Sequence, residues 1–230
     1  MSSTKAIKSR IRSVRNTSQI TKAMEVVSAA KMRKAQQFAI QARPYAVASL
    51  EILQNLLSRT DRKPKLLVSR DVKKSVLLVV TADKGLAGAF TMNVLRRADA
   101  WIEEKKSRGA DYVLITVGKK ANDYYERRNK PIQDRFVKFG DYAHLDETLP
   151  VAKTVIDGFL YGIWDEVDAV YTNFRSTLKQ ETVLKRILPV TEAGIREIVE
   201  ALLPERGRYA ELREERHAAF RYSYEYLFEP

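Results

Sequence analysis

The stretch that decides the fold is Leu77-Leu78-Val79-Val80-Thr81-Ala82-Asp83-Lys84-Gly85-Leu86-Ala87-Gly88-Ala89-Phe90. Its first four residues form a continuous apolar run, as is typical of a strand buried on both faces of a sheet. A loop with two glycines follows, and after it one apolar helical stripe continues up to Gly109. A strand, a loop and a helix in this order predict the first unit of a parallel α/β sheet.

The same alternation continues downstream. We predict strands at Tyr112–Val117, Ile132–Phe139, Val167–Phe174 and Glu181–Val190, and an edge strand at Tyr222–Phe228. Helices are predicted at Lys119–Asn129 and Leu149–Trp164, with a helix or loop excursion at Glu192–Leu203. The predicted fold class is therefore α/β, with a Rossmann-like twisted sheet domain flanked by helices over residues 73–230. Within that domain, residues 192–216 are interpreted as an enlarged excursion.

Upstream of the sheet, residues 4–57 predict one very long helix, and residues 58–72, which include Pro64, predict a linker. The helical stretch contains no glycine and a single proline, Pro44. Its apolar side chains recur at helical spacing, and we predict that they form a coiled-coil seam; the seam residues are Ile7, Ile11, Val14, Ile20, Met24 and Val27. Because a helix of this length would span about 80 Å at 1.5 Å per residue, we expect it to project from a domain of this size.

The charge is concentrated in that helix. The chain has 230 residues and a net charge of +12, and residues 1–43 hold ten basic residues against the single acid Glu25. The segment therefore carries +9 of the +12 and predicts an acidic partner, which leaves nucleic acid, an anionic membrane or acidic protein loops. A membrane-surface helix is disfavoured, because residues 4–35 contain no Phe, Trp, Tyr or Leu.

Several kinds of chemistry are excluded or disfavoured. There is no cysteine, and His144 and His217 are the only histidines, so thiolate sites are excluded and a multi-histidine metal centre is not expected. The acids Asp165, Glu166 and Asp168 are interpreted as a solvated turn. The longest stretch without a charged residue, Gly85–Leu95, has 11 residues, which is too short for a transmembrane helix.

The loop after the first strand leaves three interpretations. It could hold a phosphate at a helix N-terminus, but no Lys-Ser/Thr follows Gly88, so it is not a P-loop. It could be a tight turn that needs glycine dihedral angles. We favour the third interpretation, a loop that docks onto another protein.

Two long motifs resemble one known family. Ile7-Lys8-Ser9-Arg10-Ile11-Arg12-Ser13-Val14-Arg15-Asn16-Thr17-Ser18-Gln19-Ile20-Thr21-Lys22-Ala23-Met24-Glu25-Val26-Val27-Ser28-Ala29-Ala30-Lys31-Met32-Arg33 resembles the N-terminal helix of the gamma subunit of F-type ATP synthase. The segment Asp83–Phe90 resembles that family's glycine-rich loop, and Tyr224–Pro230 resembles the segment that closes its central domain. The resemblance extends through the whole chain and is weakest near residues 192–216.

The resemblance implies a rotor that has no catalytic site of its own. A central stalk would turn inside the ring of alpha and beta subunits, driven by proton flow through the c-subunit ring. Its successive orientations would favour different beta conformations, which is a shift of equilibrium by differential binding. No cofactor is expected on this chain, since adenine nucleotide and Mg²⁺ would be bound by the partner subunits. The resemblance further implies a peripheral protein on the cytoplasmic side of a bacterial inner or plasma membrane.

The resemblance also implies partners and contact residues. The alpha and beta ring, epsilon and the c ring would be partners, with delta in the same complex and no nucleic acid. Acidic lever loops of beta would meet the basic helix, and a second beta contact would fall on the glycine-rich loop. The implied contact residues are Lys22, Met24, Val27, Lys31, Arg33 and Lys34 on the helix, and Asp83, Lys84, Gly85, Leu86, Ala87 and Gly88 on the loop.

One departure from the family pattern concerns the seam. The family has a second long helix after the segment that resembles Tyr226–Pro230, and it pairs with the first helix. We expect the seam to be covered by such a helix, by a separate chain or by the ring, and we favour the helix. The remaining alternative is a basic-armed nucleic-acid-binding module with a Rossmann-like body, against which stands the lack of aromatic residues in residues 4–35.

Overall fold

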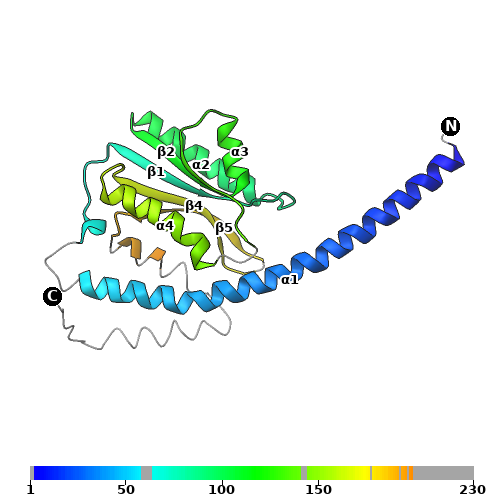
Figure 1. Ribbon diagram of the computed structural model, residues 1–230, viewed down its shortest axis with the longest axis horizontal. Helices are drawn as coiled ribbons and strands as arrows, with labels where there is room; N and C mark the ends of the chain where they lie inside the picture. The colour runs from blue at the N-terminus through cyan, green and yellow to red at the C-terminus, as the bar shows by residue number, and fades with distance from the viewer. Residues whose placement is uncertain are drawn as a thin grey trace. The chain divides into compact units, whose positions relative to one another are not determined.

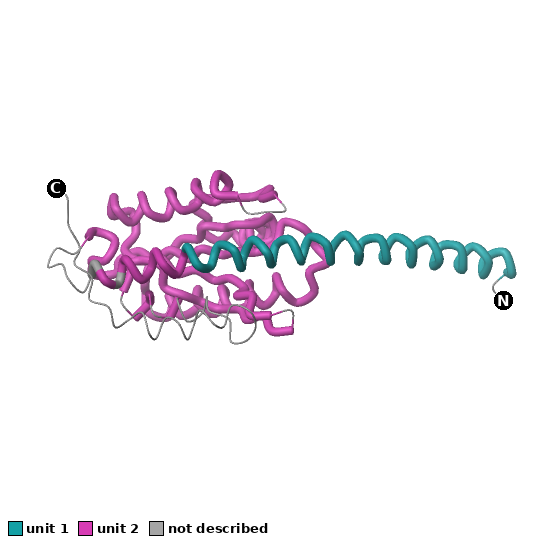
Figure 2. The backbone as a smooth tube through the Cα atoms, turned by 90° about the horizontal axis from the view of Figure 1, so that it is seen from below, with its two compact units in different colours: residues 1–45 teal, residues 46–230 magenta. Residues whose placement is uncertain are grey.

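The structure is a computed structural model that describes residues 3–57, 64–140, 144–176, 178–191, 193–195 and 197–198. The chain divides into two units, residues 1–45 and residues 46–230 (Figure 2). The predicted edge strand Tyr222–Phe228 and most of the predicted excursion lie outside the described residues. Residues 193–195 and 197–198 of the excursion are helical, and Ile195 is buried.

The long helix is confirmed at the predicted bounds. α1 covers Thr4–Leu57 and continues through Pro44, which therefore does not end it. Residues 4–45 belong to the first unit, and the last turns of α1 belong to the second unit, in which Val47 is buried. No helix among the described residues has the length and apolar character needed to cross a bilayer.

The second unit contains the predicted sheet. Its strands are β1 (Lys74–Val80), β2 (Asp111–Val117), β3 (Ile132–Phe136), β4 (Glu166–Phe174) and β5 (Gln180–Leu188), in the spatial order β3-β2-β1-β4-β5. The first four strands of this order are parallel to one another, and β5 is antiparallel to β4. The chain therefore crosses from one side of β1 to the other between β3 and β4, as in a doubly wound sheet.

Helices cover both faces of the sheet, each over its own apolar core (Figure 1). α2 (Phe90–Ser107) and α3 (Lys119–Glu126) lie on one face, where Trp101 and Tyr125 pack against Leu77 and Leu114. α4 (Leu145–Leu160) lies on the other face, where Phe159 and Trp164 pack with strand residues. A short 3-10 helix, η1, covers Lys65–Leu67.

Several predicted boundaries were wrong, among them the end of α4, which lies at Leu160 and not at Trp164. α4 begins at Leu145 and not at Leu149, because Glu147 accepts a hydrogen bond from the His144 backbone N–H (3.4 Å) and caps the helix four residues ahead of the predicted start. α3 ends before Asn129, which has a left-handed φ of 49°. β3 ends at Phe136 because Lys138, with φ of 67°, turns the chain away from the sheet.

The interpretation of residues 165–168 as a solvated turn was also wrong. Glu166 lies on β4 and is 3% exposed. One of its carboxylate oxygens accepts hydrogen bonds from Lys105 and from the Ser75 hydroxyl (2.7 Å), and the other contacts Arg186 (2.6 Å). The chain thus buries a carboxylate by surrounding it with cations and a hydroxyl from three other elements.

Asp168 lies two residues further along β4 and is buried in the same way. It accepts a hydrogen bond from the Trp101 indole N–H (2.8 Å) and one from Arg186 Nε (2.5 Å). Trp101 in turn receives the Lys105 ammonium over its ring at 5.2 Å. These contacts fasten α2 and β5 to β4, so the network fixes the helix that follows the glycine-rich loop.

Glu166 should make the stability of the sheet domain depend on pH. Burial raises the pKa of Glu166, but the hydrogen bonds from Lys105 and Ser75 and the charges of Arg186 and Lys105 outweigh burial, so the pKa lies below the usual value of 4.5. A lowered pKa stabilises the fold above pH 4.5, and this contribution disappears as the pH falls through the lower native pKa. We expect Glu166→Gln to cost about 3 kcal/mol of unfolding free energy at pH 7, because it leaves the buried Lys105 ammonium without its carboxylate partner.

That cost should shrink steadily as the pH falls below 4.5. The measurement is urea unfolding at several pH values, followed by the fluorescence of Trp101 and Trp164, which are the only tryptophans of the chain. The matched control is Glu103→Gln, which removes an exposed i,i+3 pair with Lys106 and should change the unfolding free energy very little. A pH-independent cost at Glu166 would show that its charge does not stabilise the fold.

Candidate functional site

The glycine-rich loop leaves the carboxyl end of β1, at the edge of the sheet where doubly wound folds bind their ligands. Its root is anchored by Thr81, which is buried. The Thr81 backbone N–H donates to Val117 O (2.8 Å), and the Thr81 hydroxyl oxygen accepts a hydrogen bond from the Ala121 backbone N–H (2.9 Å). The Lys120 backbone N–H donates to Ala82 O (3.1 Å). These contacts hold the start of the loop against the end of β2 and the first turn of α3.

Asp83 extends this anchorage to a third segment. Its Oδ1 accepts a hydrogen bond from the Lys119 backbone N–H (2.7 Å), and its Oδ2 accepts one from the Phe139 backbone N–H (3.0 Å). The carboxylate therefore joins the loop to α3 and to the chain that follows β3. These two hydrogen bonds fix the orientation of the Asp83 carboxylate at the root of the loop.

Beyond Asp83 the loop is open to solvent. Residues 84–89 are all exposed, and Leu86 is 92% exposed with a left-handed φ of 62°. Gly88 also has a left-handed φ, 56°, and a Cβ added there would meet nothing within 4 Å. Gly85, in contrast, does not have a positive φ. The loop thus combines a fixed root with a protruding tip.

A groove of about 490 Å³ lies beside the loop root. It is lined by Val80, Thr81, Ala82, Asp83, Lys84, Val117, Phe139, Gly140 and Thr148. Asp83 is the only acid among these residues, and none is a histidine. No three His, Asp or Glu side chains of the described residues come together to hold a metal ion. The ionisable side chains of this lining are therefore one carboxylate, Asp83, and one ammonium group, Lys84.

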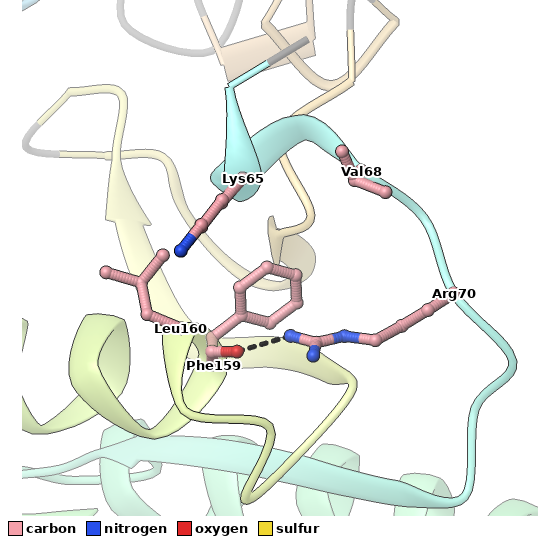
Figure 3. A pocket seen from close by; sticks show the side chains of 5 residues that line it. All are labelled: Lys65, Val68, Arg70, Phe159 and Leu160. Atoms are coloured by element: carbon pink, nitrogen blue, oxygen red, sulfur yellow. Dashed lines mark hydrogen bonds between the residues drawn. The ribbon is translucent and has the colours of Figure 1, made fainter.

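A second, smaller pocket of about 200 Å³ is lined by Lys65, Val68, Arg70, Phe159 and Leu160 (Figure 3). The Arg70 guanidinium lies 4.2 Å from the centre of the Phe159 ring and donates a hydrogen bond to Phe159 O. Asp165 pairs with the same guanidinium at 3.5 Å. Because this cation is already stacked, bonded and paired, we interpret the pocket as a structural joint between α4 and the segment before β1.

The first unit offers a different kind of surface, an exposed basic helix. The seam residues Ile7, Ile11, Val14, Ile20, Met24 and Val27 are 45–61% exposed. Lys22 and Arg33 are exposed and make no ion pair with any residue that the structure describes, whereas Lys31 is half-buried. Thus Lys22, Met24, Val27 and Arg33 all lie on an accessible stretch of one helix.

The seam residues do not form one continuous stripe. Ile7, Ile11 and Val14 are spaced by four and three residues, and so are Ile20, Met24 and Val27. Ile20 follows Val14 by six positions, one fewer than the seven positions of a heptad. The second group is therefore rotated by about 100° around the helix relative to the heptad seam that the first group defines. The two groups therefore face different directions, and pairing of the whole seam with one partner helix stays a prediction.

Hydroxyl groups occupy the break between the two groups. Thr17 Oγ1 donates to Ser13 O (3.0 Å), and Thr21 Oγ1 donates to Thr17 O (3.0 Å) and to Ser18 O (3.0 Å). These side chains satisfy their hydrogen bonds within their own helix. The hydroxyl donors of Thr17 and Thr21 therefore require no acceptor from outside the helix.

The structure places the predicted loop residues 83–88 together, and it shows contacts that the sequence did not reveal. The clamp made by Asp83 and the exposure of Leu86 were not predicted, nor were the contributions of Phe139 and Thr148 to the groove. An aspartate in the loop shortly after a buried strand was the one available signal, since Asp side chains in loops commonly bond to backbone groups. Contact of any of these residues with a partner stays a prediction.

Comparison with known proteins adds a family to this geometry. A family model described as ATP synthase matches residues 3–230. The ATP synthase gamma chain of Roseiflexus castenholzii is 41% identical over 221 residues, covering 89% of this chain and 76% of that protein. The gamma chain of Chloroflexus aurantiacus is 40% identical over 229 residues, covering 92% and 78%. The Gloeothece citriformis gamma chain is 38% identical, and the chain spans only 63% of its length.

Two solved structures share the fold. The central stalk and c ring of the Tetrahymena thermophila mitochondrial ATP synthase contains a chain that matches with a TM-score of 0.58 and 21% identity, covering 87% of this chain and 85% of that one. A chain of the Euglena gracilis mitochondrial ATP synthase rotor matches with a TM-score of 0.53 and 18% identity, covering 84% and 65%. At this level of identity these matches support the architecture alone.

Proposed function

The chain belongs to the ATP synthase gamma-chain family, and from that premise we propose that it is the central-stalk rotor subunit of an F-type ATP synthase. In this role it couples proton flow through the membrane sector to ATP synthesis or hydrolysis on the beta subunits. The observation that carries the proposal is that the family match extends over residues 3–230, and so includes both the basic helix and the anchored loop.

The physical basis of the coupling is differential binding. A stalk that contacts three beta subunits unequally stabilises a different beta conformation in each orientation, and turning it therefore shifts the nucleotide affinity of each site. Exposed charge pairs contribute only about 0–1 kcal/mol each. Several such contacts bias the orientation of the stalk without fixing it, as rotation requires.

Both candidate surfaces have proposed partners. Lys22, Met24, Val27, Lys31, Arg33 and Lys34 on α1 are assigned to the alpha–beta ring, with the acidic lever loops of beta as the electrostatic partner. Residues 83–88 are assigned to a second contact with beta. The sheet domain is assigned to epsilon and the c ring, with delta in the same complex. The subunit would be peripheral, on the cytoplasmic side of a bacterial inner or plasma membrane.

Catalysis is assigned to the partner subunits. The groove beside the loop contains no histidine and a single acid, Asp83, which accepts hydrogen bonds from two backbone N–H groups. Adenine nucleotide and Mg²⁺ are accordingly assigned to beta. The gamma-chain relatives give the nucleic-acid alternative no support.

We expect the chain to co-purify with alpha and beta subunits when the three are expressed together. ATP hydrolysis should belong to that assembly, and the purified chain alone should show no turnover above background. Lys84→Ala serves as the control, because it removes the cation of the loop that could bind a phosphate. A turnover by the pure chain that is lost in Lys84→Ala would contradict the assignment of catalysis to the partners, and failure to assemble would contradict the rotor role.

A further inference from the structure

The tip of the glycine-rich loop presents an apolar side chain in an unusual conformation. Leu86 has a φ of 62°, although left-handed backbone angles are uncommon outside glycine, asparagine and aspartate. The same side chain is 92% exposed. A leucine in this position gains neither from its backbone conformation nor from burial, and outliers of this kind are characteristic of binding sites.

The loop is built so that this side chain is held at a defined place. Asp83 ties the root to α3 and to the segment after β3, through the backbone N–H groups of Lys119 and Phe139. At the other end, the Phe90 N–H bonds to Ala87 O (3.3 Å) as α2 begins. The loop is therefore fixed at both ends, and only a short segment around Leu86 is free to make contacts.

Lysines without ion pairs surround this tip. Lys84 precedes it, and Lys120 Nζ would lie 3.9 Å from a Cβ added at Gly85. Neither lysine forms an ion pair with a residue that the structure describes. The nearby carboxylate of Asp83 accepts hydrogen bonds from two backbone N–H groups, and its charge offsets one of the two lysine charges. The tip thus offers an apolar group beside a small net positive charge.

We propose that Leu86 is the apolar anchor of this loop, and that it enters an apolar hollow bordered by carboxylates on a subunit of the catalytic head. This rests on the proposed function, which assigns the loop to a contact with beta, and adds which side chain provides the affinity. Contacts of this kind are dominated by a few well-buried apolar residues, while the surrounding charges guide association. Asp83 is a positioning residue, because it acts by holding the backbone that carries Leu86.

The test measures the affinity of the full chain for the assembled alpha–beta head. Leu86→Gly removes the side chain and relieves the backbone angle, whereas Leu86→Asn keeps a residue that tolerates the left-handed angle but is polar. We expect both to weaken binding at least tenfold and to the same extent, because the apolar side chain is lost in each. Leu86→Met should retain most of the affinity.

The matched control is Leu178→Asn, since Leu178 is another leucine in a turn and is 98% exposed. It should bind like the unmodified chain, and tryptophan fluorescence should show that every variant is folded. Asp83→Asn should weaken binding, and adding it to Leu86→Gly should cause no further loss, because a loosened loop matters only while the anchor is present.

The outcomes separate this inference from the function on which it rests. If the unmodified chain does not bind the head, the rotor proposal fails. If it binds, and Leu86→Gly and Leu86→Asn bind as tightly as the unmodified chain, the assignment of Leu86 as the anchor is wrong while the rotor role stands. Binding that is lost in Lys84→Glu with Lys120→Glu, but is indifferent to Leu86, would make the loop a purely electrostatic contact and would also overturn the anchor.

Discussion

Replacing Gly118 with alanine should strongly destabilise the sheet domain. Gly118 joins β2 to α3 with a φ of 95°, and its N–H donates to Phe136 O (2.8 Å). A Cβ at this position would lie 2.2 Å from Thr81 O and 2.7 Å from the Thr81 carbonyl carbon. Both contacts are with backbone at the root of the glycine-rich loop, so no rotation of a side chain relieves them.

We expect Gly118→Ala to lower the unfolding free energy by more than about 4 kcal/mol. This is a large share of the roughly 5–15 kcal/mol by which an ordinary domain is stable. Gly109→Ala is the matched control, because Gly109 also has a positive φ, 66°, but nothing lies within 4 Å of an added Cβ. That variant should lose only about 1 kcal/mol, the cost of the left-handed angle. Urea unfolding and far-ultraviolet circular dichroism measure both. Equal midpoints for the two variants would mean that Thr81 moves away and that the loop root is less fixed than its hydrogen bonds indicate.

Reversing Lys22 and Arg33 to glutamate should uncouple the assembled enzyme without unfolding the chain. Both side chains are exposed on α1 and make no ion pair with a described residue. Against acidic loops, each reversal replaces an attraction by a repulsion worth up to about 1 kcal/mol. Two reversals therefore change the free energy of an orientation equilibrium by about 2 kcal/mol, which changes its equilibrium constant more than tenfold.

We expect ATP-driven proton pumping by the reconstituted complex to fall several-fold, and the loss to be smaller at high salt because exposed charges are screened. The thermal transition of the sheet domain, followed by tryptophan fluorescence, should not move. Lys5→Glu with Lys8→Glu makes the same change in charge nearer the start of the helix and should affect pumping less. Normal pumping in the first variant, or an equal loss in both, would contradict specific docking at Lys22 and Arg33.

The elements that were predictable from the sequence are those whose pattern is local. The apolar run at Leu77–Val80 and the long stretch without glycine from Thr4 to Leu57 each carry their own signal, and the structure confirms both. The burial of Glu166 carried no such signal. Its partner Lys105 lies 61 positions away, and until the fold brings them together a carboxylate at a strand start resembles a solvated turn.

The candidate loop shows the same limit. Its position after a buried strand was predictable, and of its two glycines Gly88 has the left-handed φ that glycine favours. The sequence did not show that Leu86, rather than Gly85, has the left-handed angle, because this depends on where Asp83 holds the root. The Phe139 N–H that Asp83 binds is 56 positions away. A clamp between distant backbone groups leaves no periodicity by which it could be recognised.

The hydroxyl groups at the break in the apolar seam have a consequence for friction during turning. Thr17 and Thr21 donate to carbonyl oxygens of their own helix, so these polar groups are satisfied whatever surface lies opposite. A helix that relied on hydrogen bonds to one particular neighbour would have to break them at every step, with a barrier set by the cost of an unpaired polar group. Internal bonding keeps that barrier low on this stretch. When this stretch passes successive neighbours, the hydrogen bonds that Thr17 and Thr21 donate therefore remain unbroken.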